Sequence, residues 1–129
     1  MSERTVLIPD ASHPIGIEKT GARVIVSVAT GRIADSDGAQ TLTEASYPPV
    51  YYIPREDVDM SLLVRSAHTT YCPYKGEANY YSVPSLGEKG RNCIWTYEAP
   101  YEAVARIAQH LAFYPDRVDI ELRDRTGSA

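Results

Sequence analysis

The stretch Arg23-Val24-Ile25-Val26-Ser27-Val28, followed by Thr30-Gly31 and then Ile33-Ala34-Asp35-Ser36, establishes what kind of fold this chain adopts. β-branched residues crowd the first run, and a glycine-containing turn separates it from the second. Two short extended runs joined by such a turn are typical of an antiparallel hairpin. The sequence therefore predicts a β domain in which neighbouring strands pair with each other.

Further extended runs lie on the C-terminal side of this hairpin, each bounded by proline, glycine or other turn-forming residues. They are Ala39–Glu44, Val50–Ile53, Thr69–Tyr71, Ala78–Val83, Cys93–Glu98 and Val118–Leu122. A doubly wound α/β fold needs helices between most of its strands, and this chain offers few. We therefore expect a small, mainly β, antiparallel single domain with about seven or eight short strands.

Two segments have the features of short helices. The first spans about 55–65, where Pro54 precedes a helix start and Glu56 and Asp57 favour its positive end. The second follows Pro100. Its apolar residues form a single stripe at helical spacing, Val104, Ile107, Ala108 and Leu111.

Length and composition limit the classes of protein that fit. With 129 residues we expect an N-terminal arm over 1–12, one β-rich domain over 13–122 and a polar tail over 123–129. The formal charge of −4 and the lack of a basic stripe argue against nucleic-acid binding. No apolar run approaches the roughly 20 residues that cross a bilayer, and no signal peptide is recognisable. We expect a cytoplasmic protein without a membrane partner.

The cysteine and histidine residues do not form a metal-binding pattern. The two cysteines, Cys72 and Cys93, are far apart, and the three histidines are scattered. Structural zinc sites usually place their four ligands in close pairs. We therefore expect two free thiols, no metal and no cofactor.

A reactive turn stands out at Cys72-Pro73-Tyr74-Lys75-Gly76. Proline favours the second position of a β-turn, which brings the first and fourth residues within about 7 Å of each other. A nearby ammonium group lowers the pKa of a thiol, so Cys72 could be a nucleophile with Lys75 assisting it. Lys75 could instead bind an anion or a carbonyl group, or simply pair with an acid such as Glu77 or Glu98.

Aromatic residues concentrate around the same turn. Adjacent tyrosines in a strand point to opposite faces, so one of each pair could line a cavity. Aromatic walls with a few polar groups are typical of small-molecule sites, although tyrosines also favour strands for purely structural reasons. Glu44 could face the pocket as a base or as the partner of Lys75, and His68 could act as a base for Cys72. The candidate ligand-binding residues are Tyr51, Tyr52, Tyr74, Lys75, Tyr81, Trp95 and Glu44.

Several of these motifs occur together in one bacterial family. They are His13-Pro14-Ile15, Val50-Tyr51-Tyr52-Ile53-Pro54, Cys72-Pro73-Tyr74-Lys75-Gly76, Tyr81-Ser82, Trp95-Tyr97-Glu98 and Ala112-Phe113-Tyr114-Pro115-Asp116-Arg117-Val118-Asp119. In their order and spacing the chain resembles domain-of-unknown-function family 427, sometimes labelled nucleotidyltransferase-like, from about His13 to Leu122. The resemblance implies a small, mostly β fold of the β-tent kind and no established activity.

The residues themselves give the nucleotidyltransferase label little support. Such chemistry needs paired acids for magnesium and a glycine-rich or basic phosphate cradle. Asp57 and Asp59 have suitable spacing, but no Gly-x-Gly or Gly-x-x-x-x-Gly-Lys element occurs.

Three functions remain open at this point. The first is binding of an unknown small molecule in an aromatic-lined pocket beside the Cys72–Gly76 turn. The second is an enzyme that uses Cys72 as nucleophile with Lys75 or His68, and the third is a structural or protein-interaction module. The sequence leaves the oligomeric state undetermined.

Overall fold

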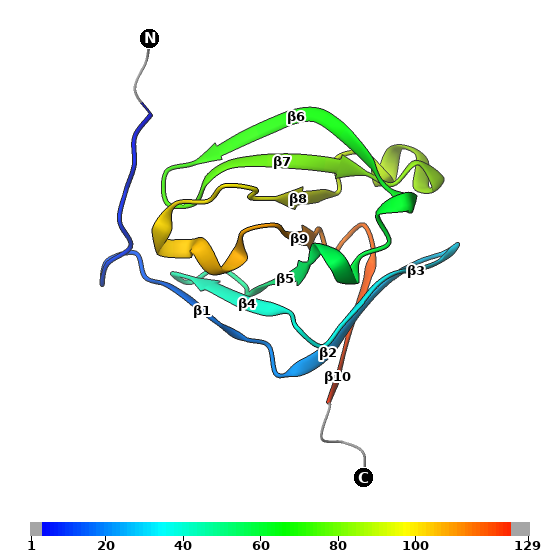
Figure 1. Ribbon diagram of the computed structural model, residues 1–129, viewed down its shortest axis with the longest axis horizontal. Helices are drawn as coiled ribbons and strands as arrows, with labels where there is room; N and C mark the ends of the chain where they lie inside the picture. Colours follow the sequence, from blue (N-terminus) through cyan, green and yellow to red (C-terminus); the bar gives the residue numbers. More distant parts are fainter. Residues whose placement is uncertain (1–3, 125–129) are drawn as a thin grey trace.

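Ten strands form two antiparallel sheets in the computed structural model, which describes residues 4–124. The large sheet has seven strands in the order β1-β4-β5-β9-β8-β7-β6, and the small sheet has three in the order β10-β2-β3 (Figure 1). The mainly β, antiparallel class predicted from the sequence is confirmed. The strands are β1 Ile15–Lys19, β2 Ala22–Val28, β3 Gly31–Ser36, β4 Gln40–Glu44, β5 Val50–Pro54, β6 Val64–Cys72, β7 Gly76–Ser82, β8 Ile94–Thr96, β9 His110–Phe113 and β10 Asp119–Asp124.

The hairpin expected from the sequence is β2 and β3. Val28 pairs with Gly31, so Ala29 and Thr30 form its two-residue loop. Strand β10 pairs with β2 on the other side, from Asp119 opposite Ser27 to Asp124 opposite Ala22. The sequence predicted fewer strands than the structure contains, because it named no strand at β1 and assigned the segment that contains β9 to a helix.

The large sheet curls toward one of its faces. In the sheet order, β4 and β7 are four strand spacings apart, which would be about 19 Å in a flat sheet. Yet Glu44, at the end of β4, touches Lys75, in the turn that enters β7. The face on the inside of this curl is called the inner face below.

Alternation along the strands gives the two faces of the large sheet different partners. The outer face packs on the small sheet, so that Ile53, Ile94 and Phe113 share a core cluster with Val24 and Val26. The inner face carries a second cluster and is covered by a short helical segment, η4 Glu102–Ile107 (Figure 1). Its buried members are Leu42, Tyr52, Ala78, Tyr80, Tyr97, Val104, Ile107 and Ala112.

The first predicted helix, over 55–65, is helical only as two 3-10 turns, η1 Arg55–Asp57 and η2 Met60–Leu62. Val58 interrupts them with extended backbone, forms a β-bridge with Ala34 and is buried in the core. The Asp59 N–H also donates to the Ile33 carbonyl at 2.8 Å. These bonds to β3 take the place of the i→i−4 bonds that a continuous helix would need.

The second predicted helix is η4, also a 3-10 segment, and it is shorter than the stripe suggested. Val104 and Ile107 are buried, and Val104 has non-helical backbone (φ −124°, ψ 28°) that divides η4 into two short turns. The segment η4 ends before Ala108, which has a ψ of 134°, and Gln109, with a φ of 61°, then turns the chain into β9. Leu111 therefore belongs to a strand and not to the predicted stripe. A third such segment, η3 Pro84–Gly90, lies between β7 and β8.

The ends of the described chain are attached to the body. The N-terminal segment runs alongside the β6–β7 turn (Figure 1), where the Leu7 N–H donates to the Pro73 carbonyl at 3.0 Å. Tyr71, through its hydroxyl, donates to the Thr5 carbonyl. At the other end β10 includes Arg123 and Asp124, which the sequence had assigned to the tail. The rest of the predicted tail and residues 1–3 lie outside the described residues.

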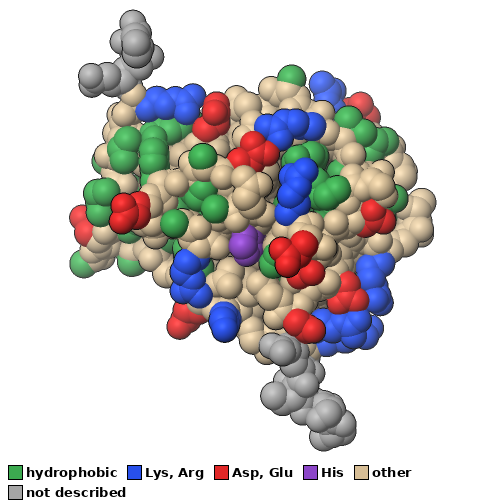
Figure 2. All heavy atoms as spheres, in the orientation of Figure 1, with side chains coloured by type: hydrophobic (Ala, Val, Ile, Leu, Met, Phe, Trp, Pro, Cys, Tyr) green, Lys and Arg blue, Asp and Glu red, His purple; other side chains and the backbone are tan. Residues whose placement is uncertain are grey.

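No helix in residues 4–124 is long and apolar enough to cross a bilayer. Acidic and basic side chains are interspersed over the face seen in Figure 2, without a broad patch of either sign.

Candidate functional site

The Cys72–Gly76 turn has the geometry that its sequence predicts. The Lys75 N–H donates to the Cys72 carbonyl at 3.2 Å, which closes the four-residue turn between β6 and β7. Gly76 follows with a φ of 109°, a conformation that side chains disfavour. The turn thus fixes where the Lys75 side chain leaves the backbone.

Lys75, Glu44 and His13 form one ion-paired cluster. Lys75 Nζ donates to Glu44 Oε1 at 2.5 Å, and His13 Nε2 donates to Glu44 Oε2 at 2.7 Å. The His13 ring also stacks on Tyr74, with ring centroids 4.2 Å apart and planes 6° apart. Three separate parts of the chain therefore meet at one carboxylate: the segment before β1, the end of β4 and the turn before β7.

This cluster is shielded from water. Lys75 is 8% exposed, and among the described residues it is the one charged residue in the buried class. The Glu44 and His13 side chains keep 16% and 25% of their exposure. Burial raises the pKa of the Glu44 carboxyl, but the hydrogen bonds from Lys75 and His13 outweigh it and leave that pKa below its ordinary value. Glu44 is consequently ionised at neutral pH.

A group of phenols extends from this cluster across the inner face. Tyr52, Tyr80 and Tyr97 are buried, and half-buried Cys72 and Trp95 pack against the same cluster. Burial raises the pKa of both Tyr52 and Tyr97, and the nearby Glu44 charge raises each further. These hydroxyls therefore stay protonated at neutral pH, and each can donate one hydrogen bond.

Trp95 connects the phenols to a groove between the start of β5 and strands β8, β9 and β10. Its Nε1 donates to the Tyr52 hydroxyl at 3.1 Å, and its ring meets Tyr52 edge to face. Strands β5 and β9 pair only at Ile53–Leu111 and Pro54–His110, so the start of β5 diverges from β9. A groove of about 480 Å³ lies at this divergence. Its lining is Tyr47, Pro48, Pro49, Val50, Tyr51, Trp95, Phe113, Pro115, Ile120 and Leu122.

The structure divides the residues that the sequence grouped together. Glu44, Tyr74 and Lys75 meet in the ion-paired cluster, Tyr52 belongs to the phenols, and Tyr51 lines the groove, with Trp95 shared between the last two. The groove contains no residue of the Cys72–Gly76 turn, so Tyr51 and Trp95 line a groove that is separate from the ion-paired cluster.

Tyr81 and His68 belong neither to the ion-paired cluster nor to the lining of the groove. Tyr81 belongs to the outer-face core, and its hydroxyl accepts from Arg55 at 3.0 Å and from Arg65 at 3.4 Å. His68 is exposed, with its ring against Tyr80. The Lys75 ammonium, which was a candidate for activating Cys72, is bonded to Glu44 instead.

Sequence reasoning missed several residues of the ion-paired cluster, the group of phenols and the groove. The bond between His13 and Glu44 joins residues 31 positions apart in the chain and could not be read from spacing. Tyr97 directly follows β8, but only the fold shows that it shares the inner face with Tyr52. Ile120 and Leu122 line the groove from β10, a strand of the small sheet, and no local pattern indicates this.

The two aspartates considered for magnesium have structural partners. Asp57 accepts from the Ser36 hydroxyl at 2.6 Å, and Asp59 accepts from the Ser61 N–H at 3.2 Å at the start of η2. Within residues 4–124, no group of three or more His, Cys, Asp or Glu side chains could hold a metal ion.

Fold and site together define a small two-sheet β domain with a shielded ion-paired cluster on the inner face of its larger sheet. The chain belongs to the family described as Domain of unknown function (DUF427), whose model matches residues 16–124. No curated protein matches its sequence.

Proposed function

We propose that this protein binds a small, largely apolar molecule in the groove between the start of β5 and strands β8–β10. The observation that supports the proposal is the groove itself, with about 480 Å³ of space and a lining of aromatic, proline and aliphatic residues. Small-molecule sites commonly have about 300–1,000 Å³ and a mostly apolar lining with a few polar groups. Tyr47 and Tyr51 contribute such groups.

The exposure of the groove residues agrees with a binding role. Tyr47 is 64% exposed and Leu122 is 42% exposed, so apolar surface meets water at the rim. A ligand that covers this surface would gain roughly 25 cal/mol for each Å² removed from water. Three of the lining residues are rigid prolines, Pro48, Pro49 and Pro115, which lowers the entropy lost on binding.

Trp95 allows the proposal to be tested without a labelled protein, because it is the single tryptophan of the chain and it lines the groove. We expect the neutral probe N-phenyl-1-naphthylamine to quench Trp95 emission in a saturable titration. Leu122→Arg would place a charged side chain at the groove and weaken probe binding at least about tenfold.

The matched control is Leu62→Arg. Leu62 is also 42% exposed but lies in η2, outside the groove. This variant should bind the probe as the wild type does. Equal probe affinity of both arginine variants, or the absence of saturable quenching in the wild type, would show that the groove is not a binding site.

A further inference from the structure

A hollow separate from the apolar groove lies where the end of β5 meets the segment that enters β9. It has about 650 Å³ of space, is lined from β5, η1, η2 and residues 108–110, and is called the η1 pocket below. Pro54 pairs with His110, and the Arg55 N–H donates to the Gln109 carbonyl at 3.2 Å, so two distant segments of the chain form its walls. None of its lining residues also lines the groove.

Arg55 brings to this pocket a positive charge that no acid neutralises within residues 4–124. Its Nη1 donates to the Tyr81 hydroxyl at 3.0 Å. Arg65, which also donates to this hydroxyl, holds the Glu98 carboxylate in two hydrogen bonds at 2.7 and 3.1 Å, and Arg55 forms no ion pair with any described residue. The Arg55 guanidinium is thus fixed at one nitrogen, and its other N–H groups are available to hold a carboxylate.

Hydrogen-bond acceptors line the same pocket. His110 Nδ1 donates to the Ala108 carbonyl at 2.8 Å, so Nε2 of the neutral ring is an acceptor. Asp59 uses Oδ1 to accept from the Ser61 N–H at 3.2 Å and from the Ser61 hydroxyl at 2.5 Å, and its Oδ2 has no partner among the described residues. Glu56 is exposed, and its carboxylate bonds to no residue in the same range. His110 and Asp59 are therefore held at one atom and keep a second atom free.

The lining of the η1 pocket thus combines an unpaired cation and unpaired carboxylates with an apolar part. Pro54, Val58, Met60 and Ala108 form the apolar part. A ligand that uses all three features carries a carboxylate and an ammonium group on an apolar body. Since pockets of about 300–1,000 Å³ hold drug-sized molecules, the space suits a dipeptide better than a single amino acid.

We propose that the η1 pocket binds a short peptide with free ends. The peptide carboxylate pairs with Arg55, and its ammonium group donates to Glu56, Asp59 and Nε2 of His110. Its side chains lie against the apolar part of the lining. This site does not depend on a ligand being bound in the groove.

Calorimetric titration with L-leucyl-L-leucine at neutral pH tests this assignment. The wild type should bind the dipeptide saturably. The N-acetylated dipeptide, which lacks the ammonium group, and the dipeptide amide, which lacks the carboxylate, should each bind at least about tenfold more weakly.

Two variants assign the two ends of the dipeptide. Arg55→Gln should bind the dipeptide and its amide equally, because the partner of the carboxylate has been removed. Glu56→Gln should bind the dipeptide about fivefold more weakly and discriminate less against the acetylated form. Glu56 has no hydrogen bond within residues 4–124 to lose, so this variant should fold and keeps the test decisive if Arg55→Gln does not.

Glu88→Gln and Arg91→Gln are the matched controls, since both residues are exposed, lie in or directly after η3 and are outside the pocket. Both should bind the dipeptide as the wild type does. The assignment is overturned if the wild type does not bind the dipeptide saturably, if either derivative binds as well as the dipeptide, or if Arg55→Gln still prefers the dipeptide to its amide. An equal loss of affinity in Glu88→Gln and Glu56→Gln would also overturn it. Loss of binding in Leu122→Arg alone would place the dipeptide in the groove, with the same consequence.

Discussion

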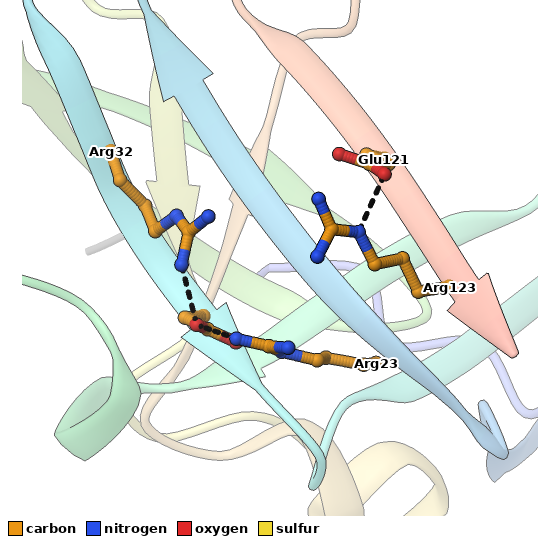
Figure 3. A network of polar contacts seen from close by, with 5 residues as sticks. Arg23, Arg32, Glu121 and Arg123 are labelled. Carbon is orange, nitrogen blue, oxygen red and sulfur yellow. Dashed lines mark hydrogen bonds and ion pairs between the residues drawn. The ribbon is translucent and has the colours of Figure 1, made fainter. Parts of the chain in front are cut away.

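Two ion-paired clusters of this protein have similar chemistry and opposite surroundings. On the small sheet, Asp35 accepts from Arg23 at 2.6 and 2.7 Å and from Arg32 at 3.0 Å, and Glu121 pairs with Arg123 (Figure 3). Those side chains are between 33% and 54% exposed. On the inner face, Glu44 holds Lys75 and His13 with side chains that are 10–25% exposed.

The difference shows that burial, more than the number of contacts, determines what an ion pair does. Water and salt screen the attraction between the two charges of an exposed ion pair. Such pairs therefore contribute little to stability. Shielded charges interact strongly, but each has already lost its hydration, so removal of one partner leaves the other without compensation. The inner cluster is therefore sensitive to change in a way that the small-sheet cluster is not.

The largest effect should come from neutralising the shared carboxylate. Glu44→Gln leaves the Lys75 ammonium buried without its counter-ion and should lower the free energy of unfolding by about 3 kcal/mol. Asp35→Asn is the matched change on the small sheet and should unfold close to the wild-type midpoint. Urea unfolding followed by circular dichroism measures both. Equal destabilisation by the two substitutions would contradict the contrast between the clusters.

An intermediate effect is expected from acid. The pKa of folded Glu44 lies below its ordinary value of 4.5, so the stability that its charge contributes is present above that pH. It is lost as the pH falls through the lower, folded-state pKa. The difference in unfolding free energy between wild type and Glu44→Gln should therefore be constant near neutral pH and shrink below about pH 4.5. A difference independent of pH down to about pH 2 would show that charge is not the cause.

The smallest effect concerns salt. Raising the sodium chloride concentration to about 1 M shortens the screening length to about 3 Å and weakens exposed pairs most. Any loss of stability in Asp35→Asn should disappear under these conditions, whereas most of the loss in Glu44→Gln should remain. Thermal unfolding of both variants at low and high salt measures this. If salt removed the loss of stability equally in the two variants, the inner cluster would be as solvated as the cluster on the small sheet.

Much of the fold follows from local sequence pattern. Runs rich in β-branched or alternating apolar residues correctly indicated β2 and β10, the glycine-containing turn indicated β3, and proline and glycine marked the ends of several strands. Helix signals failed at Val58 and Leu111, because pairing with β3 and entry into β9 override them. Neither competing interaction is visible in the local sequence.

The candidate site was less predictable because it joins distant segments. The turn geometry at Cys72–Lys75 is local and could be predicted, and Glu44 was recognised as a candidate partner of Lys75. The curl of the large sheet brings them together and adds His13, and no spacing rule describes that curl. Tyr81 was assigned to the wrong place because alternation tells which residues share a face, but not which face curls inward.

The most direct test of the contrast between the two clusters is the free energy of unfolding of Glu44→Gln compared with that of the double variant Glu44→Gln/Lys75→Met. The double variant should be the more stable of the two, because Lys75→Met removes the ammonium that Glu44→Gln leaves buried without its counter-ion. A double variant that unfolds more easily than Glu44→Gln alone would contradict the claim that the inner cluster is sensitive because its charges are buried.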